Sequence, residues 1–424
     1  MATTTGGFSS EGLALEARTL ELESLSHKDA IEIGEIALDL GFDRGLGIAV
    51  EVRLKEWTVF HASLPGSTLE NDSWINGWSK EFALELGELG WIGLTWPTEF
   101  GGGGRPPIER LIIGEELIKV GAPIGSMWFA DRQMGPTLIT YGRPDQQAEF
   151  LPSILTGAST WCIGMSEPNA GSDVGQIQTT AIRNGDGWLL NGSKTWIINA
   201  IHADGVVVYA QTQVGSGVKG IAAFFIRADS PGFERVVVDT NSALSSMGIG
   251  GFRLTNVYCD SSHMLYEPGK AFVDIMGAIN RARTYVAAMC CAMVSQALTD
   301  VSVYGHKRTA FGQSLDQYQG WRWQIAQAAT ALQAAELLVR EACDLIDKGG
   351  EVQTAAAQAK LYATSMAQTQ LGSLLHAMGA EGFLDRYAFL RHLTAAHTAS
   401  LADGSTAMLL ERVANDFRFK PGAI

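Results

Sequence analysis

The spacing of apolar residues divides most of the chain into three stretches. Residues 79–158 carry apolar positions at helical spacing, in two segments separated by the Gly- and Pro-rich loop 95–107. From about 160 to 262, short β-branched or aromatic runs are interrupted by Gly, Asn and Asp, which is typical of strands. From about 270 to the end, long Ala-rich amphipathic segments predict helices again. The pattern predicts an α+β protein, mainly α, with a β part between two helical parts.

These changes of pattern suggest domain boundaries. We place an N-terminal helical domain at 78–158, a middle β domain at 159–268 and a C-terminal helical bundle at 269–424. Residues 1–77 precede this organisation and contain a helical pattern followed by two alternating, strand-like segments. They are either an ordinary N-terminal extension or a truncated domain.

Composition and charge exclude several classes of protein. The net charge of -14 argues against nucleic acid and anionic membranes as main partners. No apolar run approaches the roughly 20 residues of a membrane span, and the first residues lack a signal-peptide pattern. The five cysteines show no CxxC spacing, so we expect no metal site and reduced thiols in a cytoplasmic protein. Two of them, Cys290 and Cys291, lie in an apolar helical run and are expected in the core.

The stretch 163–181 is rich in small and hydroxyl-bearing residues and opens the β part. Such a segment lets backbone N–H groups approach a polar or anionic ligand closely, and Ser166 and Ser172 add hydroxyl donors. A Gly/Ser-rich surface loop is the simpler explanation. The sequence MSEPNAGSD within it (165–173) favours the ligand site, because it resembles the signature of the acyl-CoA dehydrogenase family.

This resemblance runs in order from about residue 78 to 424. Further segments that resemble the family are 89–102, 135–157, 191–200, 307–326 and 376–383. The family implies an N-terminal helical domain, a middle β-barrel domain and a C-terminal four-helix bundle, usually in a tetramer. It also implies FAD and removal of one hydrogen from each of the α and β carbons of an acyl-CoA. Separately, residues 59–76 resemble the first part of a small HbpS-like haem-degrading domain.

The resemblance assigns a set of residues to FAD. The backbone of Met165 and the hydroxyl of Ser166 would contact the pyrimidine edge of the flavin, and Ser172 would lie near the pyrophosphate and the substrate. Trp196 would lie against the flavin ring, unless it is an ordinary core tryptophan. The complete cofactor set is Ile163, Met165, Ser166, Ser172, Trp196, Ile198, Arg308, Gln319, His376, Gly379 and Ser405.

Two members of this set imply an oligomer. Arg308 is a permanent cation suited to the FAD pyrophosphate, unless it is a solvated charge at a helix end. In the family, the residues matching Arg308 and Gln319 reach a neighbouring subunit's cofactor, which implies at least a dimer.

The chain departs from the family at several cofactor positions. Ile198 stands where a threonine hydroxyl often donates to flavin N5. His376 and Ala380 replace the usual Gln and Gly, and Ala407 replaces a Gln that often helps to hold FAD. Each change removes a polar contact or adds a methyl group near the cofactor, which leaves open how tightly FAD is bound.

Asp403 aligns with the family's catalytic glutamate and is the predicted base. The family's second position for the base is Ala282 here, which cannot accept a proton. Arg283 and Gly404 are assigned with Ser172 to the substrate. Asp403 could instead cap the last helix. As a base beside an acyl chain, it should have a pKa that burial raises above the ordinary value of about 3.9.

The aspartate is shorter than glutamate by one methylene, and aspartate also occupies this position in nitroalkane oxidase. The sequence therefore predicts an FAD-dependent acyl-CoA dehydrogenase in which Asp403 takes the α proton and flavin N5 takes the β hydride. A nitroalkane-oxidase-type enzyme and a cofactor-poor structural subunit are the alternatives. The implied partners are an acyl-CoA, an electron-transfer flavoprotein or similar acceptor, and further copies of the chain in a homodimer or homotetramer.

Overall fold

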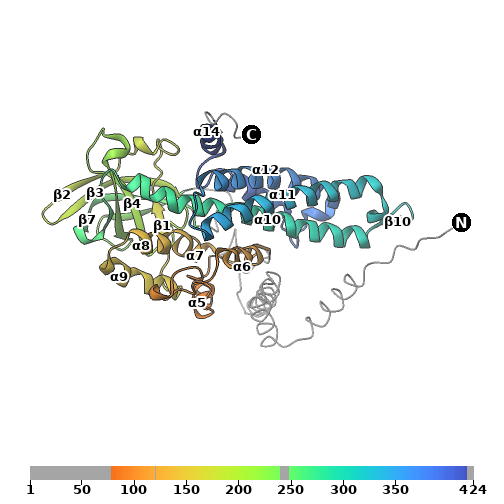
Figure 1. Ribbon diagram of the computed structural model, residues 1–424, viewed down its shortest axis with the longest axis horizontal. Coiled ribbons are helices and arrows are strands. Elements are labelled where there is room, and N and C mark those ends of the chain that lie inside the picture. The colour runs from red at the N-terminus through yellow and green to blue at the C-terminus, as the bar shows by residue number, and fades with distance from the viewer. Residues whose placement is uncertain (1–77, 120, 239–247, 418–424) are drawn as a thin grey trace. The chain divides into compact units, whose positions relative to one another are not determined.

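The computed structural model describes residues 78–119, 121–238 and 248–417. The expectations made for residues 1–77, including the HbpS-like segment, lie outside these ranges. Within them the chain forms helices, then a sheet, then helices (Figure 1). The order and class of elements predicted from the sequence are therefore confirmed.

The first helical part contains short helices around a buried segment of mixed polarity. α5 begins after Ser79, whose hydroxyl accepts a hydrogen bond from the backbone N–H of Phe82 (3.1 Å). All five residues of the π-helical turn η2 are buried, although three of them are polar. The elements are α5 (Lys80–Glu88), α6 (Pro107–Lys119), α7 (Gly125–Phe129), η2 (Ala130–Met134), α8 (Gly135–Tyr141) and α9 (Pro144–Leu155).

The middle part is one sheet with the order β6-β7-β3-β2-β4-β5-β8, and β1 pairs with β4 in parallel. All residues of β4 are buried, as are all but the last of β5, which makes these strands the centre of the sheet's core. The strands are β1 (Trp161–Gly164), β2 (Thr180–Asn184), β3 (Gly187–Ile197), β4 (Gly205–Gln211), β5 (Ile221–Arg227), β6 (Phe233–Val237), β7 (Gly250–Asp260) and β8 (Met264–Tyr266).

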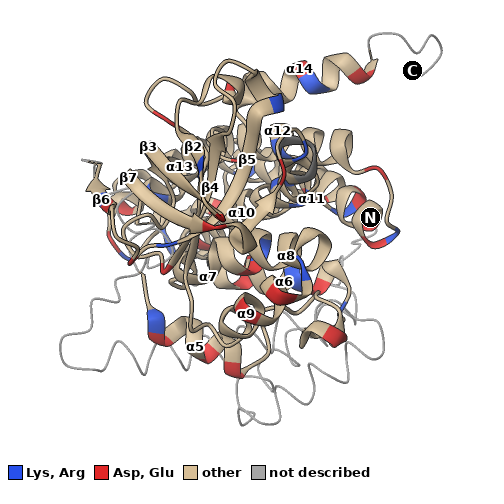
Figure 2. Cartoon of the chain, turned by 90° about the vertical axis from the view of Figure 1, so that its left-hand side faces the viewer, with Lys and Arg blue, Asp and Glu red and all other residues tan. Residues whose placement is uncertain are grey.

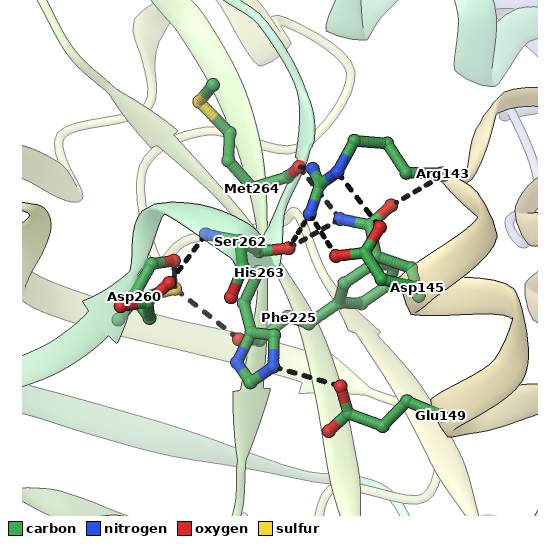
Figure 3. A network of polar contacts seen from close by, with 10 residues as sticks. Arg143, Asp145, Glu149, Phe225, Asp260, Ser262, His263 and Met264 are labelled. Carbon is green, nitrogen blue, oxygen red and sulfur yellow. Dashed lines mark hydrogen bonds and ion pairs between the residues drawn. The ribbon is translucent and has the colours of Figure 1, made fainter.

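A polar network joins α9 to the sheet (Figure 3). Arg143, which precedes α9, donates to the backbone carbonyl of Ser262 and to that of Met264 (3.3 Å). On the same helix, Glu149 pairs with His263 (Oε2 to Nε2, 3.2 Å). These contacts fix the end of the first helical part against the segment that links β7 to β8.

The last part is built on α10 (Ala271–Lys307), which packs against α11 (Gln319–Asp347) and α12 (Gln353–Met378). A two-stranded ribbon, β9 (Thr309–Ala310) and β10 (Gln313–Ser314), follows α10 at the end of the bundle away from the sheet (Figure 1). The chain continues into α13 (Phe389–Ala399) and α14 (Thr406–Phe417).

The central helix α10 is unusually apolar. By length and composition alone, Ile275–Lys307 is sufficient to cross a membrane, contrary to the expectation that no apolar run is long enough. However, 61% of its apolar window is buried inside the protein, as in the central helix of a bundle. Cys290 and Cys291 on this helix are buried free thiols, which confirms their predicted place in the core.

Acidic and basic side chains occur together on the outer helices. α6 and α14 each carry acidic and basic side chains (Figure 2). This mixed distribution differs from the basic stripe that binds nucleic acid.

Candidate active site

Two segments of the predicted flavin site are joined by the fold. Ile163 lies in β1, and the chain leaves that strand through Met165 and Ser166. The backbone N–H of Thr195 in β3 donates to the carbonyl of Ser166 (3.1 Å). The structure therefore places the MSEPNAGSD segment beside the end of β3, next to Trp196. The predicted contact Ser172 is exposed farther along the same loop.

Trp196 is presented by a strained backbone. Its φ is +60°, a left-handed value that a bulky residue rarely adopts. The pairing of β3 with β7 shifts register between Lys194 and Ile197, and the Trp196 side chain is left 60% exposed. An ordinary core tryptophan would be buried without strain. An exposed, strained aromatic residue fits a wall for a planar ligand.

A buried ion pair that the sequence analysis missed supports this region. Lys194 Nζ donates to Glu167 Oε1 (2.8 Å) and to the carbonyl of Met165 (3.1 Å). The carboxylate of Glu167 also accepts from the backbone N–H groups of Gln178 (2.6 Å) and Thr179 (2.9 Å). Burial lowers the pKa of Lys194 to about 8. In the sequence, the signals were Glu167, a charged residue within a predicted loop, and Lys194, a charged residue within a predicted strand.

Asp403 lies in the turn between α13 and α14, as the sequence predicts. Its φ is +51°, and Gly404 follows with a φ of +106°. Its carboxylate accepts from Arg132 Nη1 (2.9 Å) and from Gln133 Nε2 (3.2 Å), both on η2. These partners belong to a distant part of the chain. Among the described residues, no backbone N–H of α14 donates to the Asp403 carboxylate, so the geometry does not match a helix cap.

Two further cations hold the backbone of this turn. Arg283 Nε on α10 donates to the carbonyl of Asp403 (2.9 Å). Lys360 Nζ on α12 donates to the carbonyl of Gly404 (2.7 Å) and to that of Ala402. Burial lowers the pKa of Lys360 to about 8 and that of Arg283 to about 10. Three elements therefore hold this turn: η2 contacts the Asp403 carboxylate, and α10 and α12 contact the backbone carbonyls.

These cations change the expected pKa of Asp403. Burial pushes the pKa upward, but Arg132, Lys360 and the hydrogen bonds outweigh it and hold the pKa below its ordinary value. The expected rise concerns the carboxyl beside a bound acyl chain and stays a prediction, whereas the surroundings that the structure describes lower the pKa. The physical reason is the ion pair with Arg132, which the sequence analysis did not include.

Arg132 contacts both candidate positions for the base, Asp403 and Ala282. Its Nη1 donates to the carbonyl of Ala282 (3.1 Å) as well as to Asp403, and its guanidinium stacks over the ring of Trp128 (4.2 Å to the centroid). Arg132 is only 5% exposed. Its signal in the sequence was the run Asp131, Arg132, Gln133, three polar residues inside an apolar helical segment.

The other predicted cofactor residues lie elsewhere. Arg308 follows the end of α10, Gln319 begins α11, and His376 and Gly379 lie at the end of α12. The last two lie near the start of α11, because Trp321 Nε1 donates to the carbonyl of Ala377 (3.3 Å). We call Arg308, Gln319, His376 and Gly379 the distal cluster.

The distal cluster is far from Asp403 within one chain. Arg283 and Arg308 are separated by about 37 Å of continuous helix. One chain therefore does not gather both sets of predicted cofactor residues around one ligand. Ser405 remains with Asp403, between the turn and α14.

Comparisons with known families cover the described chain. A model described as the acyl-CoA dehydrogenase N-terminal domain matches residues 69–158. The middle-domain model matches 162–257, and the C-terminal-domain model matches 270–417.

Individual proteins agree with the domain matches. A curated relative named probable acyl-CoA dehydrogenase YngJ, from Bacillus subtilis, is 30% identical over 76% of this chain and 85% of its own length. The butyryl-CoA dehydrogenase structure from Megasphaera elsdenii superposes with a TM-score of 0.77 at 27% identity, over 81% of this chain and 91% of its own. A chain in a structure of the electron transferring flavoprotein of Acidaminococcus fermentans gives 0.79 at 26% identity, over 88% and 98%.

Proposed function

Because the chain belongs to the acyl-CoA dehydrogenase family, we propose that it oxidises an acyl-CoA thioester with Asp403 as the base for the α proton. The observation that carries this proposal is the turn 402–404: side chains of η2 hold its one carboxylate, and cations of α10 and α12 hold its backbone carbonyls. Ala282, the alternative position, offers no acceptor side chain.

The surroundings of Asp403 give it two properties that a base needs. Arg132 and Lys360 keep the carboxyl ionised, because they lower its pKa. The hydrogen bonds from Arg132 and Gln133 fix its direction, which matters because a misplacement of about 1 Å can reduce a rate on the order of 100-fold. The α proton would move to a carboxylate oxygen of Asp403, leaving a neutral acid beside Arg132. A lowered pKa makes Asp403 a weak base, so the bound thioester must acidify the α carbon strongly.

We further propose that FAD lies against Trp196, with Met165, Ser166 and Ile198 around its ring. The strained, exposed indole and the backbone coupling between Ser166 and Thr195 support this placement. When bound, FAD would accept the β hydrogen with its electron pair at N5. The distal cluster would hold the cofactor of a second copy, since one chain separates the two sets of residues.

The anaerobic absorption spectrum tests the proposed function. The purified protein should be yellow, and an acyl-CoA from a panel of chain lengths should bleach the flavin bands without oxygen. Bleaching by nitroalkanes but not by acyl-CoA, with fast reoxidation by oxygen, would favour the nitroalkane-oxidase type. A protein that stays colourless after FAD addition would favour a structural subunit.

The family and the matched structures also support proposals for partners. We propose an electron-transfer flavoprotein or a similar acceptor, a homodimer or homotetramer as the active form, and a cytoplasmic location.

Ile198→Thr should speed flavin reduction by bound acyl-CoA about 2- to 10-fold. The threonine would add a hydroxyl donor near the flavin, and a net hydrogen bond contributes about 0.5–1.5 kcal/mol. Anaerobic stopped-flow absorbance measures the rate, with Ile198→Val as the control that changes shape without adding a donor. An unchanged or slower rate in the threonine variant would mean that the pocket is built around the isoleucine methyl groups.

Arg308→Ala should weaken FAD retention about tenfold, because an exposed guanidinium suited to the pyrophosphate is lost. Equilibrium dialysis against FAD measures the dissociation constant. Arg253→Ala, which removes a surface arginine of β7, is the matched control. If both variants retain FAD equally well, the distal cluster is not part of the cofactor site.

A further inference from the structure

Asn199 is a buried asparagine close to the candidate flavin site. It follows Trp196 in the turn after β3, and it is 0% exposed with a left-handed φ of +66°. Its side chain reaches the first helical part, because Asn199 Nδ2 donates to the backbone carbonyl of Gly125 at the start of α7 (2.5 Å). The amide therefore joins the segment that carries Trp196 to α7.

Gly125 begins a buried segment that leads to the candidate base. All residues of α7 are buried, and α7 continues into η2 without a break. Arg132 and Gln133 on η2 donate to the Asp403 carboxylate. Gly125 and Arg132 are about 10 Å apart along this helical segment, at about 1.5 Å per residue. A shift of α7 is therefore transmitted to the side chains that hold Asp403.

Other contacts hold the same two segments together. His202 stacks on Trp78, with ring centroids 4.5 Å apart and 20° between the ring planes. Trp78 in turn pairs with Ile124 in an isolated β-bridge, and β1 contacts both α7 and η2. The Asn199 amide is thus one contact among several, so its removal should displace α7 slightly and leave the fold intact.

Neither stability nor backbone conformation explains the Asn199 amide. Asn199 Oδ1 is buried and has no hydrogen-bond partner among the residues that the structure describes. An unpaired acceptor of this kind is unfavourable, and native proteins contain few of them. The left-handed backbone does not require the amide either, because glycine adopts that conformation freely. The directional contact from the amide to Gly125 is the remaining reason for it.

We propose that Asn199 is a positioning residue for the oxidation of the acyl-CoA. It fixes the segment of Trp196 relative to η2, so that the flavin and Asp403 face neighbouring carbons of one acyl chain. A misplacement of about 1 Å between such groups can reduce a rate on the order of 100-fold. Apolar packing is non-directional, whereas a buried hydrogen bond sets both a distance and a direction. This inference rests on the proposed function and on FAD lying against Trp196.

Asn199→Gly tests the inference, because glycine keeps the left-handed backbone and removes only the amide. In the FAD-saturated protein, flavin reduction by bound acyl-CoA should slow about 10- to 100-fold, while the dissociation constant for FAD changes less than about threefold. Anaerobic stopped-flow absorbance and equilibrium dialysis measure the two quantities. An unchanged rate, or an equal loss in rate and in FAD affinity, would contradict the proposal. A variant that no longer unfolds cooperatively would make Asn199 a structural residue and would also overturn it.

Asn256→Gly is the matched control. Asn256 on β7 also has a left-handed φ, +51°, and its Oδ1 accepts from Asn191 Nδ2 (3.1 Å) at an exposed site. This variant should reduce its flavin as fast as the wild type. Because both variants replace a left-handed asparagine by glycine, an equal loss of rate in the two would assign the effect to the backbone and overturn the proposal.

A double-mutant cycle with Gln133→Leu tests the route through η2. Gln133 Nε2 donates to Asp403 Oδ1 (3.2 Å). If Asn199 acts by placing η2, its amide matters less once the Gln133 contact is gone. The double variant should then be reduced at least about threefold faster than the product of the two single losses predicts. Losses that multiply would show that Asn199 does not act through η2.

Melting temperatures separate a failure of this inference from a failure of the proposed function. Without any acyl-CoA, the drop in melting temperature of the double variant should be smaller than the sum of the two single drops. If no acyl-CoA reduces the wild-type flavin, the proposed function fails, and the melting temperatures still test the connection. Drops that add would overturn the connection between Asn199 and η2, whereas smaller drops would support it.

Discussion

Replacing Asp403 by asparagine should slow flavin reduction by bound acyl-CoA about 100- to 10,000-fold, the range expected for a lost general base. The amide has the size of the carboxylate and still accepts hydrogen bonds from Arg132, but it cannot take the α proton. Asparagine also tolerates the left-handed φ of +51° at this position, so the turn should keep its conformation. Anaerobic stopped-flow measurement on FAD-saturated protein gives the rate, and acyl-CoA binding should persist.

The matched control for this prediction is Asp403→Glu, which keeps the charge and the base. It should lose far less activity, although the longer side chain must fit the space held by Arg132 and Gln133. If the asparagine variant reduces its flavin as fast as the wild type but melts earlier, the carboxylate serves only to pair with Arg132. If neither rate nor stability changes, Asp403 has neither role.

Arg132→Met should lower the free energy of unfolding at pH 7 by about 3–5 kcal/mol, because removing one partner leaves the other charge of a buried pair uncompensated. Methionine keeps an unbranched chain over Trp128, so most of the packing is retained. Lys360 still lies near Asp403, so the lower end of this range is the expected value. Urea denaturation of the variant and the wild type measures the difference, provided that the m-values agree.

The pH dependence identifies the charge as the cause. In the wild type the pKa of Asp403 is lowered, so its contribution to stability is present above the unfolded-state pKa of about 3.9 and is lost as pH falls through the folded-state pKa. In the methionine variant burial is no longer opposed by Arg132, so the pKa of Asp403 should rise. The stability difference should therefore shrink between pH 7 and pH 4. A difference that does not change with pH would mean that Arg132 acts through packing on Trp128.

Arg253→Met is the control for the loss of an arginine. Arg253 Nη1 pairs with Glu234 Oε2 at 3.3 Å on the surface of the sheet, and both side chains are mostly exposed. Exposed pairs contribute about 0–1 kcal/mol, so this variant should be nearly as stable as the wild type.

The sequence predicts the local elements and the motifs well, because both depend on neighbouring residues. Helical spacing located α5, α11 and α12, and the turn around Asp403 lies where the Gly404 break indicated it. The acyl-CoA dehydrogenase motif led to the segment beside Trp196. Each of these signals is contained within a window of about 10–20 residues.

The contacts that set the chemistry were not predicted, because they join residues far apart in the sequence. Arg132 precedes Asp403 by 271 positions. The spacing of apolar residues cannot show which side chain of another element will meet a carboxylate. It also cannot show the charge balance around that carboxylate, which lowers the pKa of Asp403 before any acyl chain lies beside it.

The left-handed backbone at Asp403 limits which residues can replace it during evolution. Aspartate and asparagine visit that region more readily than other side chains, whereas a longer or branched residue carries a conformational penalty of roughly 1–2 kcal/mol. The backbone conformation thus restricts which residues can replace Asp403, and this restriction is independent of proton transfer. A glutamate at this position would carry that penalty, so the shorter acid suits the backbone conformation of Asp403 and Gly404.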